Sequence, residues 1–211
     1  AAMVGHAADV ELQRDGCNAL WTMALGSDVC IQAVVGAGGA AAVVAAMVRH
    51  AADLLLQRAG CDALQSMAGG NDACKQAVVD ARGLVAVVAA MVGYAADVRL
   101  QRAGCGALCN MAVGQRRYAQ AVVDARGPAA VVAAMRGHVA DVQLQRAGLE
   151  ALWNMAFGKY ARIRAVLGAG GAAAGGGDGQ THCGRRAAEV GLRRAAEHGC
   201  WQQRRAQAGG R

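Results

Sequence analysis

A 44-residue internal repeat constrains the fold of this chain more than any other feature. One methionine recurs at this interval, at Met3, Met47, Met91 and Met135. The residues around it recur as well, for example in AAMVRHAADLLLQRAGC and AAMVGYAADVRLQRAGC, and the similarity stops after Ala174. A unit of this size cannot bury its own apolar surface, so about four units are expected to stack into one solenoid over residues 1–174.

Each unit predicts three helices and no strand. In the second copy, the first helix is expected at residues 72–79 and ends near Gly83, which suits a left-handed cap because it has no side chain. The second helix is expected at residues 84–92. The third is expected to start at Asp53, a good N-cap residue, and to run to about Ala68. The predicted fold class is therefore all-α, a right-handed superhelical solenoid of three-helix repeats.

The third helix of each unit has two different faces. On a helical wheel of the first copy, Leu12 and Met23 lie in a broad apolar arc, whereas Arg14 and Asn18 lie in a polar arc and Trp21 lies at the border. The apolar arc predicts the core. The polar arc predicts a surface that faces solvent or a partner.

The order of segments in one unit resembles an armadillo repeat. The segments are D-A-C-K-Q-A-V-V-D-A-R-G, then L-V-A-V-V-A-A-M, then L-L-L-Q-R-A-G-C-D-A-L-Q-S-M-A. The resemblance covers residues 1–174 and begins partway through a second helix; a HEAT-type repeat is the alternative. It implies a non-enzymatic scaffold or adaptor that binds an extended polypeptide in a concave groove. The third helices would line this groove, at residues 9–25, 53–69, 97–113 and 141–157.

The resemblance also implies a role for an asparagine late in the third helix. Asn110 and Asn154 match that position, whereas Thr22 and Ser66 occupy it in the other copies. Importin-like repeats carry a tryptophan four residues earlier, and this chain has other residues there: Asn18, Asp62, Gly106 and Glu150. The candidate groove residues are Arg14, Asn18, Trp21, Thr22, Arg58, Asp62, Gln65, Ser66, Arg102, Cys109, Asn110, Arg146, Glu150, Trp153 and Asn154. The strongest anchors among them are expected to be Trp153, Asn154 and Arg146, with Trp21 a weaker one.

One arginine column runs through every copy: Arg14, Arg58, Arg102 and Arg146. Two interpretations are open. The guanidinium groups could bind carboxylates or backbone carbonyls of a partner. Alternatively, they could pair within their own helix, as Arg58 with Asp62 and Arg146 with Glu150.

Composition argues against other function classes. Residues 175–211 hold seven arginines and three acidic residues, so they contribute +4 of the net charge of +7. Aromatic residues, which could stack on bases, make up only 3% of the chain. Nucleic-acid binding is therefore the less favoured alternative.

The column of His6, His50 and His138 predicts polar residues at helix ends, because equivalent positions in stacked helices cannot converge on a metal. No metal, cofactor or catalytic residue is predicted, since Ser27 and Ser66 lie outside any nucleophile motif.

The cysteines predict buried free thiols in a reducing compartment. They recur with the repeat and form no CxxC pair, so we expect a cytoplasmic or nuclear protein. Cys109 stands in a column with Trp21, Gln65 and Trp153, and we expect an ordinary residue at the groove edge.

Residues 29–48 are uncharged and long enough for a membrane span, but we expect none. The equivalent columns of the sister copies hold charged residues, namely Lys75, Asp80, Arg82, Asp124 and Arg126.

Residues 175–211, rich in Arg, Gly and Ala, are interpreted as a fifth repeat in a shifted reading frame. Back-translation shifted by one base permits A-M-V-R-H-(I/T)-A-D-V-E-L-Q-R-(L/S/W)-G-C-D-A-L-Q-S-M-A between Gly177 and Cys200. All but the two bracketed positions allow a residue found in that column of an intact copy. The tail itself is expected to be disordered or an isolated helix around residues 185–207. A decayed gene fragment without present function is a further alternative, and the chain could also be a piece of a longer protein.

The predicted partner is a polypeptide, and the predicted molecule is a monomer without a membrane segment. Because the chain opens inside a unit and has no evident polar cap, its ends are expected to be sticky. End-to-end self-association is therefore possible in this interpretation.

Overall fold

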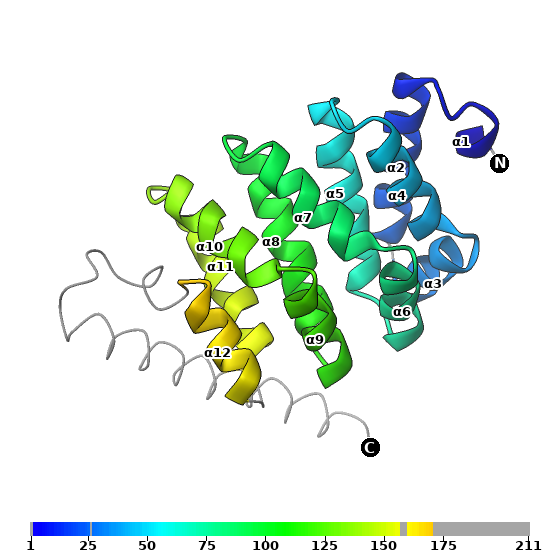
Figure 1. Cartoon of the computed structure of the whole chain (residues 1–211). Helices are drawn as coiled ribbons and strands as arrows, with labels where there is room; N and C mark the ends of the chain where they lie inside the picture. The colour runs from blue at the N-terminus through cyan, green and yellow to red at the C-terminus, as the bar shows by residue number, and fades with distance from the viewer. Residues whose placement is uncertain (1, 26, 157–159, 171–211) are drawn as a thin grey trace, which may run out of the picture.

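The computed structural model describes residues 2–25, 27–156 and 160–170, and within these residues the chain is an all-helical solenoid (Figure 1). The predicted tail and its boundary at Ala174 lie outside the described residues. The helices are α1 (Ala2–Gly5), α2 (Val10–Ala24), α3 (Asp28–Gly36), α4 (Gly39–Arg49), α5 (Leu54–Ala68), α6 (Asp72–Asp80), α7 (Gly83–Gly93), α8 (Val98–Ala112), α9 (Arg116–Asp124), α10 (Gly127–Gly137), α11 (Val142–Ala156) and α12 (Tyr160–Gly168).

The helices form units of three, as predicted. The first helices α3, α6, α9 and α12 have 9 residues each, and the second helices α4, α7 and α10 have 11. The third helices α2, α5, α8 and α11 have 15. In Figure 1 the units lie side by side, with the second helices nearer the viewer than the third helices. The predicted bounds in the second copy are confirmed to within one residue at each helix end.

In each of the four units, an aspartate caps the third helix, which confirms the N-cap predicted at Asp53. The carboxylate of Asp53 accepts the backbone N–H of Leu56 at 2.7 Å. Asp9, Asp97 and Asp141 accept the equivalent N–H groups at 3.0, 2.8 and 2.8 Å. Each cap satisfies a donor that the first helical turn leaves unpaired, which contributes about 1 kcal/mol.

The residue in the left-handed conformation is not the one predicted. Arg82, rather than Gly83, has a positive φ of 60°, and Arg126 has 63° in the next unit. Gly83 is needed for a different reason. A Cβ there would lie 2.7 Å from Cγ1 of Val78 and 3.0 Å from its carbonyl oxygen, so the second helix could not start this close to the first. The rule that favours glycine at a left-handed cap therefore predicted the correct turn but the wrong residue.

The repeating methionine packs over a repeating glycine. A Cβ built on Gly104 would lie 2.5 Å from Cγ and 2.6 Å from Sδ of Met91. Gly60 and Gly148 meet Met47 and Met135 in the same way, and Gly16 meets Met3. The glycine lets the second and third helices of a unit approach closely. This contact explains why the two residue types recur together.

A buried glutamine joins the second helix of each unit to the third. Gln101 is 1% exposed, and its Nε2 donates to the carbonyls of Met91 at 2.7 Å and Tyr94 at 3.0 Å. The equivalent side chains of Gln13, Gln57 and Gln145 make the same two bonds. These carbonyls lie at the end of the second helix, where no intrahelical donor remains. The glutamine thus supplies a donor inside the core.

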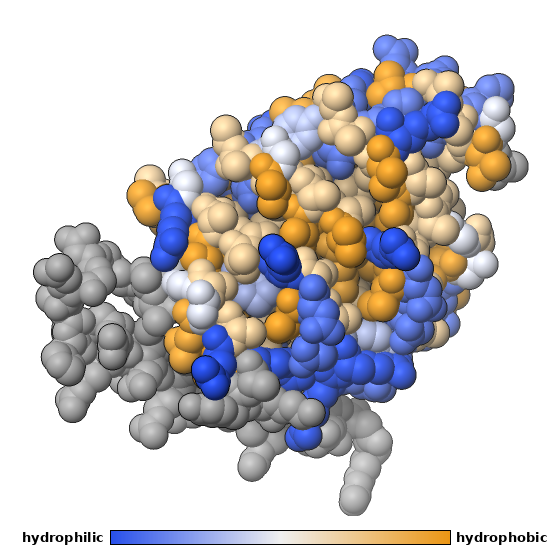
Figure 2. Space-filling view, in the orientation of Figure 1, coloured by the Kyte–Doolittle hydropathy of each residue, from blue (hydrophilic) through white to orange (hydrophobic). Residues whose placement is uncertain are grey.

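One hydrophobic core runs through the stack and confirms the predicted apolar arc. Leu56, Leu100 and Leu144 are fully buried, and the methionine late in the third helix is at most 1% exposed at Met67, Met111 and Met155. Figure 2 shows the face that α4, α7 and α10 present, where hydrophobic residues predominate, with a few hydrophilic residues among them and a hydrophilic area along the lower edge. Among the described residues, no single helix is long and apolar enough to cross a membrane. The pairs α3–α4 and α6–α7 reach that threshold only together, and each is bent by 64°.

Candidate partner-binding face

The third helices α2, α5, α8 and α11 pack against one another in a row. We call the outward side chains of these four helices the third-helix face. Its predicted residues differ in exposure. Asn18, Thr22, Arg102, Arg146 and Glu150 are exposed; Arg14, Trp21, Arg58, Asp62, Gln65, Ser66, Asn110 and Trp153 are half-buried; Cys109 and Asn154 are buried.

The arginine column links neighbouring units, which neither interpretation of the sequence predicted. Nη2 of Arg14 lies 3.0 Å from Oδ2 of Asp53, the aspartate that caps the next third helix. Arg58 binds Asp97 through both Nε, at 2.9 Å from Oδ1, and Nη2. Arg102 binds Asp141 in the same bidentate way. The predicted pair between Arg58 and Asp62 is therefore corrected, because the guanidinium group lies on the carboxylate of the next unit.

These contacts lower the pKa values of the aspartates. The hydrogen bond from Arg58 holds the pKa of Asp97 below its usual range, and Arg102 does the same for Asp141. The pKa of Asp53 is lowered mainly by the backbone N–H of Leu56, with a smaller effect from Arg14. Each aspartate thus stabilises its own helix and the contact to the preceding unit when it is ionised.

Replacing Asp97 by asparagine tests this contact, because asparagine keeps the helix cap and loses the charge. We expect the free energy of unfolding to fall by about 0.5–1 kcal/mol at pH 7, since the pair is partly exposed. The depressed pKa makes this contribution present above the unfolded value of about 3.9 and lost as the pH falls through the folded value. Urea unfolding at pH 7 and at low pH should therefore show the two chains converging in acid. Asp15→Asn is the control, and an Asp97→Asn difference that persists in acid would contradict the ion-pair explanation.

Arg146, at the end of the column, has a different environment. It is exposed and forms no ion pair within the described part of the chain, with Glu150 or with any other residue. The predicted local pair of Arg146 with Glu150 is therefore not formed. The position one unit beyond, where an aspartate would stand, lies outside the described residues.

The two asparagines bind the preceding third helix. Nδ2 of Asn110 donates to the carbonyl of Gln65 at 2.9 Å, and Nδ2 of Asn154 donates to Sγ of Cys109 at 3.2 Å. In the first copy, the hydroxyl of Thr22 donates to the carbonyl of Asn18 within its own helix at 2.8 Å. Cys109 and Asn154 were predicted at the groove surface, and the structure corrects this, because both are buried against each other.

Five of the six cysteines in the described residues are buried thiols, as predicted. Burial raises the pKa of Cys17 and Cys105 to about 12 and that of Cys109 to about 11. Cys61 and Cys74 are also buried, whereas Cys30 is exposed and corrects the prediction at that position. The buried thiols stay protonated at neutral pH and are poor nucleophiles.

The histidine column consists of polar residues at helix ends. Nε2 of His50 lies 2.8 Å from the carbonyl oxygen of Ala7 in the preceding unit, and Tyr94 donates to the equivalent Ala51 carbonyl at 2.9 Å. His138 makes the same contact with Ala95 at 2.8 Å. No group of three His, Cys, Asp or Glu residues in the described ranges could hold a metal ion. This column therefore sets the register between units.

Sequence reasoning missed a further set of contacts between the first helices. The hydroxyl of Tyr118 donates to the carbonyl of Asp72 at 2.6 Å, and Nη1 of Arg162 donates to the carbonyl of Arg116 at 2.8 Å. Both donors lie in one repeat column, and both acceptors lie one unit earlier. The signal was present in the sequence, because positions 118 and 162 are one period apart and carry long polar side chains where the other copies have cysteine.

After the arginine–aspartate pairs are set aside, the third-helix face is mostly acidic. Glu11, Asp15, Asp62 and Glu150 form no ion pair among the described residues, whereas the remaining arginines of this face are Arg99 and Arg146. Asp62 and Glu150 occupy the same column, two units apart. Burial raises the pKa of Asp62, and the nearby Arg58 offsets part of that effect.

Comparison with known proteins identifies the fold. No family model and no curated protein matches the sequence. Among solved structures, a computationally designed armadillo repeat protein for modular peptide recognition is similar with a TM-score of 0.73 at 19% identity, covering 89% of this chain and 76% of that one. The chain has an armadillo-like repeat fold.

Two other structures are similar to this armadillo-like chain. A designed armadillo repeat protein in complex with the peptide (KR)4 has a TM-score of 0.70 at 19% identity, covering 86% of this chain and 76% of that one. An engineered protein solved by a structural genomics consortium has a TM-score of 0.72 at 27% identity, covering 89% and 75%. The predicted resemblance to armadillo repeats is thus confirmed at the level of the fold.

Proposed function

We propose that this chain is a non-enzymatic scaffold that binds an extended polypeptide along the third-helix face. The observation that carries the proposal is the row of α2, α5, α8 and α11, which presents equivalent side chains once per unit. An extended chain also presents its side chains and backbone groups at a fixed interval. A repeating surface of this kind therefore suits a linear partner that crosses several units.

The similar designed proteins support this proposal. One is described as built for modular peptide recognition, and another is bound to a peptide of alternating lysine and arginine. The acidic excess on the third-helix face of this chain favours a basic partner as well. The arginine column does not oppose such a partner over most of its length, because Arg14, Arg58 and Arg102 are neutralised by the aspartates of the next units.

The positions of Asp62 and Glu150 predict the spacing between the basic residues of the partner. Packed helices are about 8–10 Å apart, so Asp62 and Glu150, which are two units apart, are separated by about 20 Å along the row. An extended chain advances about 3.3 Å per residue. The preferred partner therefore carries two Lys or Arg residues about six positions apart, with the intervening backbone crossing α8.

Peptides of fixed composition with two lysines three, six or nine residues apart test this spacing. Fluorescence anisotropy with labelled peptides and the full chain should show tightest binding at a spacing of about six. Replacing Glu150 by glutamine should weaken that peptide about fivefold, close to 1 kcal/mol, because one exposed charge contact is lost. The variant should affect the other spacings less.

Asp124→Asn is the matched control, since Asp124 is exposed on α9, away from the third-helix face. It should leave peptide affinity unchanged. Equal affinity for all three spacings would contradict the proposal. So would tighter binding to a DNA duplex, with the steep salt dependence of phosphate contacts.

A further inference from the structure

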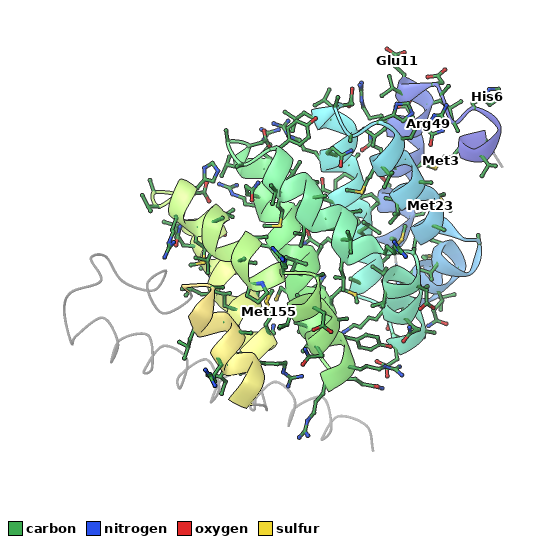
Figure 3. The ribbon with its side chains drawn as sticks, in the orientation of Figure 1. Met3, His6, Glu11, Met23, Arg49 and Met155 are labelled. Atoms are coloured by element: carbon green, nitrogen blue, oxygen red, sulfur yellow. The ribbon has the colours of Figure 1, made fainter. Side chains whose placement is uncertain are left out.

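Gln65 on α5 lies across Gly106 on α8, the next third helix. A Cβ built on Gly106 would lie 2.6 Å from Nε2, 2.7 Å from Cδ and 2.9 Å from Oε1 of Gln65. The end of the glutamine side chain therefore rests directly on the backbone of α8. Both residues are half-buried on the third-helix face. α5 and α8 are the inner helices of the row, between α2, which carries Glu11, and α11, which carries Met155 (Figure 3).

The side-chain amide of Gln65 has no hydrogen-bond partner among the described residues. Its backbone carbonyl, by contrast, accepts Nδ2 of Asn110 at 2.9 Å, which fixes this part of α5 against α8. A carboxamide offers two donors and one acceptor oxygen, and holding it half-buried without a partner is unfavourable. The base of the side chain is therefore held in place, while its polar end is available to a ligand.

Gly106 leaves a gap in one column of the third-helix face. The equivalent positions hold Asn18, Asp62 and Glu150. Glycine inside a helix is less favourable than alanine, because it loses more conformational freedom on folding. Gly106 lies within α8 and has no positive φ that would require glycine. The missing side chain does let a second backbone approach the helix closely.

The two asparagines that match the armadillo-type position are directed elsewhere. Nδ2 of Asn110 donates to the carbonyl of Gln65, and Nδ2 of Asn154 donates to Sγ of Cys109 in a buried contact. A partner that crosses α8 at Gly106 therefore meets the unpaired amide of Gln65.

Gly106 also lies midway between the two carboxylates that are proposed to bind the basic residues of the partner. Asp62, Gly106 and Glu150 occupy one column in three successive third helices. The backbone of a partner bound to both carboxylates passes over α8 beside Gln65. In an extended chain, the N–H and C=O of one residue point to the same side, as in the paired residues of an antiparallel sheet. A carboxamide can accept from the first group and donate to the second.

We propose that the carboxamide of Gln65 binds the backbone of the partner residue midway between the two basic residues. Oε1 accepts the N–H of that residue, Nε2 donates to its carbonyl, and Gly106 leaves room for this backbone against α8. The inference rests on the proposed function and deepens it. The subsite accepts any side chain at the midway position but disfavours proline, which has no N–H to donate.

A double-mutant cycle between protein and peptide tests this contact. The peptide with two lysines six residues apart is compared with the same peptide in which an ester replaces the amide that carries the midway N–H. Gln65→Met keeps a long, unbranched side chain and removes its amide. In fluorescence anisotropy, each change alone should weaken binding about fivefold, whereas the ester should cost less than about twofold in Gln65→Met. An equal loss from the ester in both proteins would overturn the inference.

Gln32→Met is the matched control, since Gln32 is exposed on α3, away from the third-helix face. It should leave both affinities unchanged. Absence of any peptide binding by the parent chain would overturn the proposed function and this inference together. Tight binding by the parent chain with unchanged affinity in Gln65→Met would overturn this inference alone.

Gly106→Ala gives a second test, in which binding and folding should change in different directions. The added Cβ would displace the end of the flexible Gln65 side chain rather than a backbone segment. The midpoint of thermal unfolding should stay the same or rise, because alanine favours the helix. Peptide affinity should nevertheless fall at least about fivefold, since the Gln65 amide is moved and the gap is filled. Unchanged affinity in Gly106→Ala would overturn the inference.

Discussion

Replacing Gln101 by glutamate is expected to lower the free energy of unfolding by at least about 3 kcal/mol at pH 7. The substitution changes little in shape but replaces a donor by a charged acceptor. Nε2 of Gln101 lies 2.7 Å from the carbonyl oxygen of Met91 and 3.0 Å from that of Tyr94 in the core. A carboxylate there would face two carbonyl oxygens without a donor between them.

The loss of unfolding free energy caused by Gln101→Glu should become larger as the pH rises. Burial raises the pKa of the introduced carboxyl group above the unfolded value of about 4.3. Its protonated form can still donate to a carbonyl, so the difference from the parent chain should shrink as the pH falls towards 4 and grow as it rises through the folded pKa. Chemical denaturation at pH 4 and pH 7 measures this. Gln143→Glu, at an exposed position of α11, is the matched control; an equal loss for both variants would contradict the buried hydrogen-bond explanation.

Replacing Gly104 by alanine is expected to destabilise the chain by about 2 kcal/mol, although alanine is the better helix former by about 1 kcal/mol. The added Cβ would lie 2.5 Å from Cγ of Met91, so α7 and α8 would have to separate or the methionine would have to change rotamer. Gly93→Ala is the control, because a Cβ at Gly93 meets nothing within 4 Å. That variant should be neutral or slightly more stable in thermal unfolding.

A double-mutant cycle separates the contact with methionine from any effect on the helix itself. Met91→Ala alone should cost about 3 kcal/mol, because Met91 is buried in the core. In that background, Gly104→Ala should become neutral or stabilising by up to about 1 kcal/mol, since the clash is gone and only the helix preference remains. The same loss in both backgrounds would show that the methionine is not the cause.

The period and the wheel were enough to predict the helices, their approximate bounds and the apolar core. The caps followed from one residue type, because an aspartate before an apolar run has few other local roles. The left-handed position was placed one residue too late. The rule that glycine tolerates a positive φ competes there with close helix packing, and at Gly83 the packing requirement is the one the structure shows.

The contacts of the candidate site could be predicted less well. The arginine column was visible, but its partners lie 39 residues away in the next unit, as Arg58 and Asp97 do, and local spacing rules do not reach that far. Asn154 matched a family position, yet in this chain it is buried against Cys109. Which polar residues face outward depends on how neighbouring units pack, and a single unit does not contain that information.

Photo-crosslinking tests the central claim, binding of an extended polypeptide along the third-helix face, most directly. A peptide with two lysines six residues apart would carry p-benzoylphenylalanine midway between them and be irradiated with the full chain. Mass spectrometry should then locate the adducts on α8 and the adjoining sides of α5 and α11, and an excess of unlabelled peptide should suppress them. Adducts confined to α4, α7 and α10, or spread evenly over all helices, would contradict binding at the third-helix face.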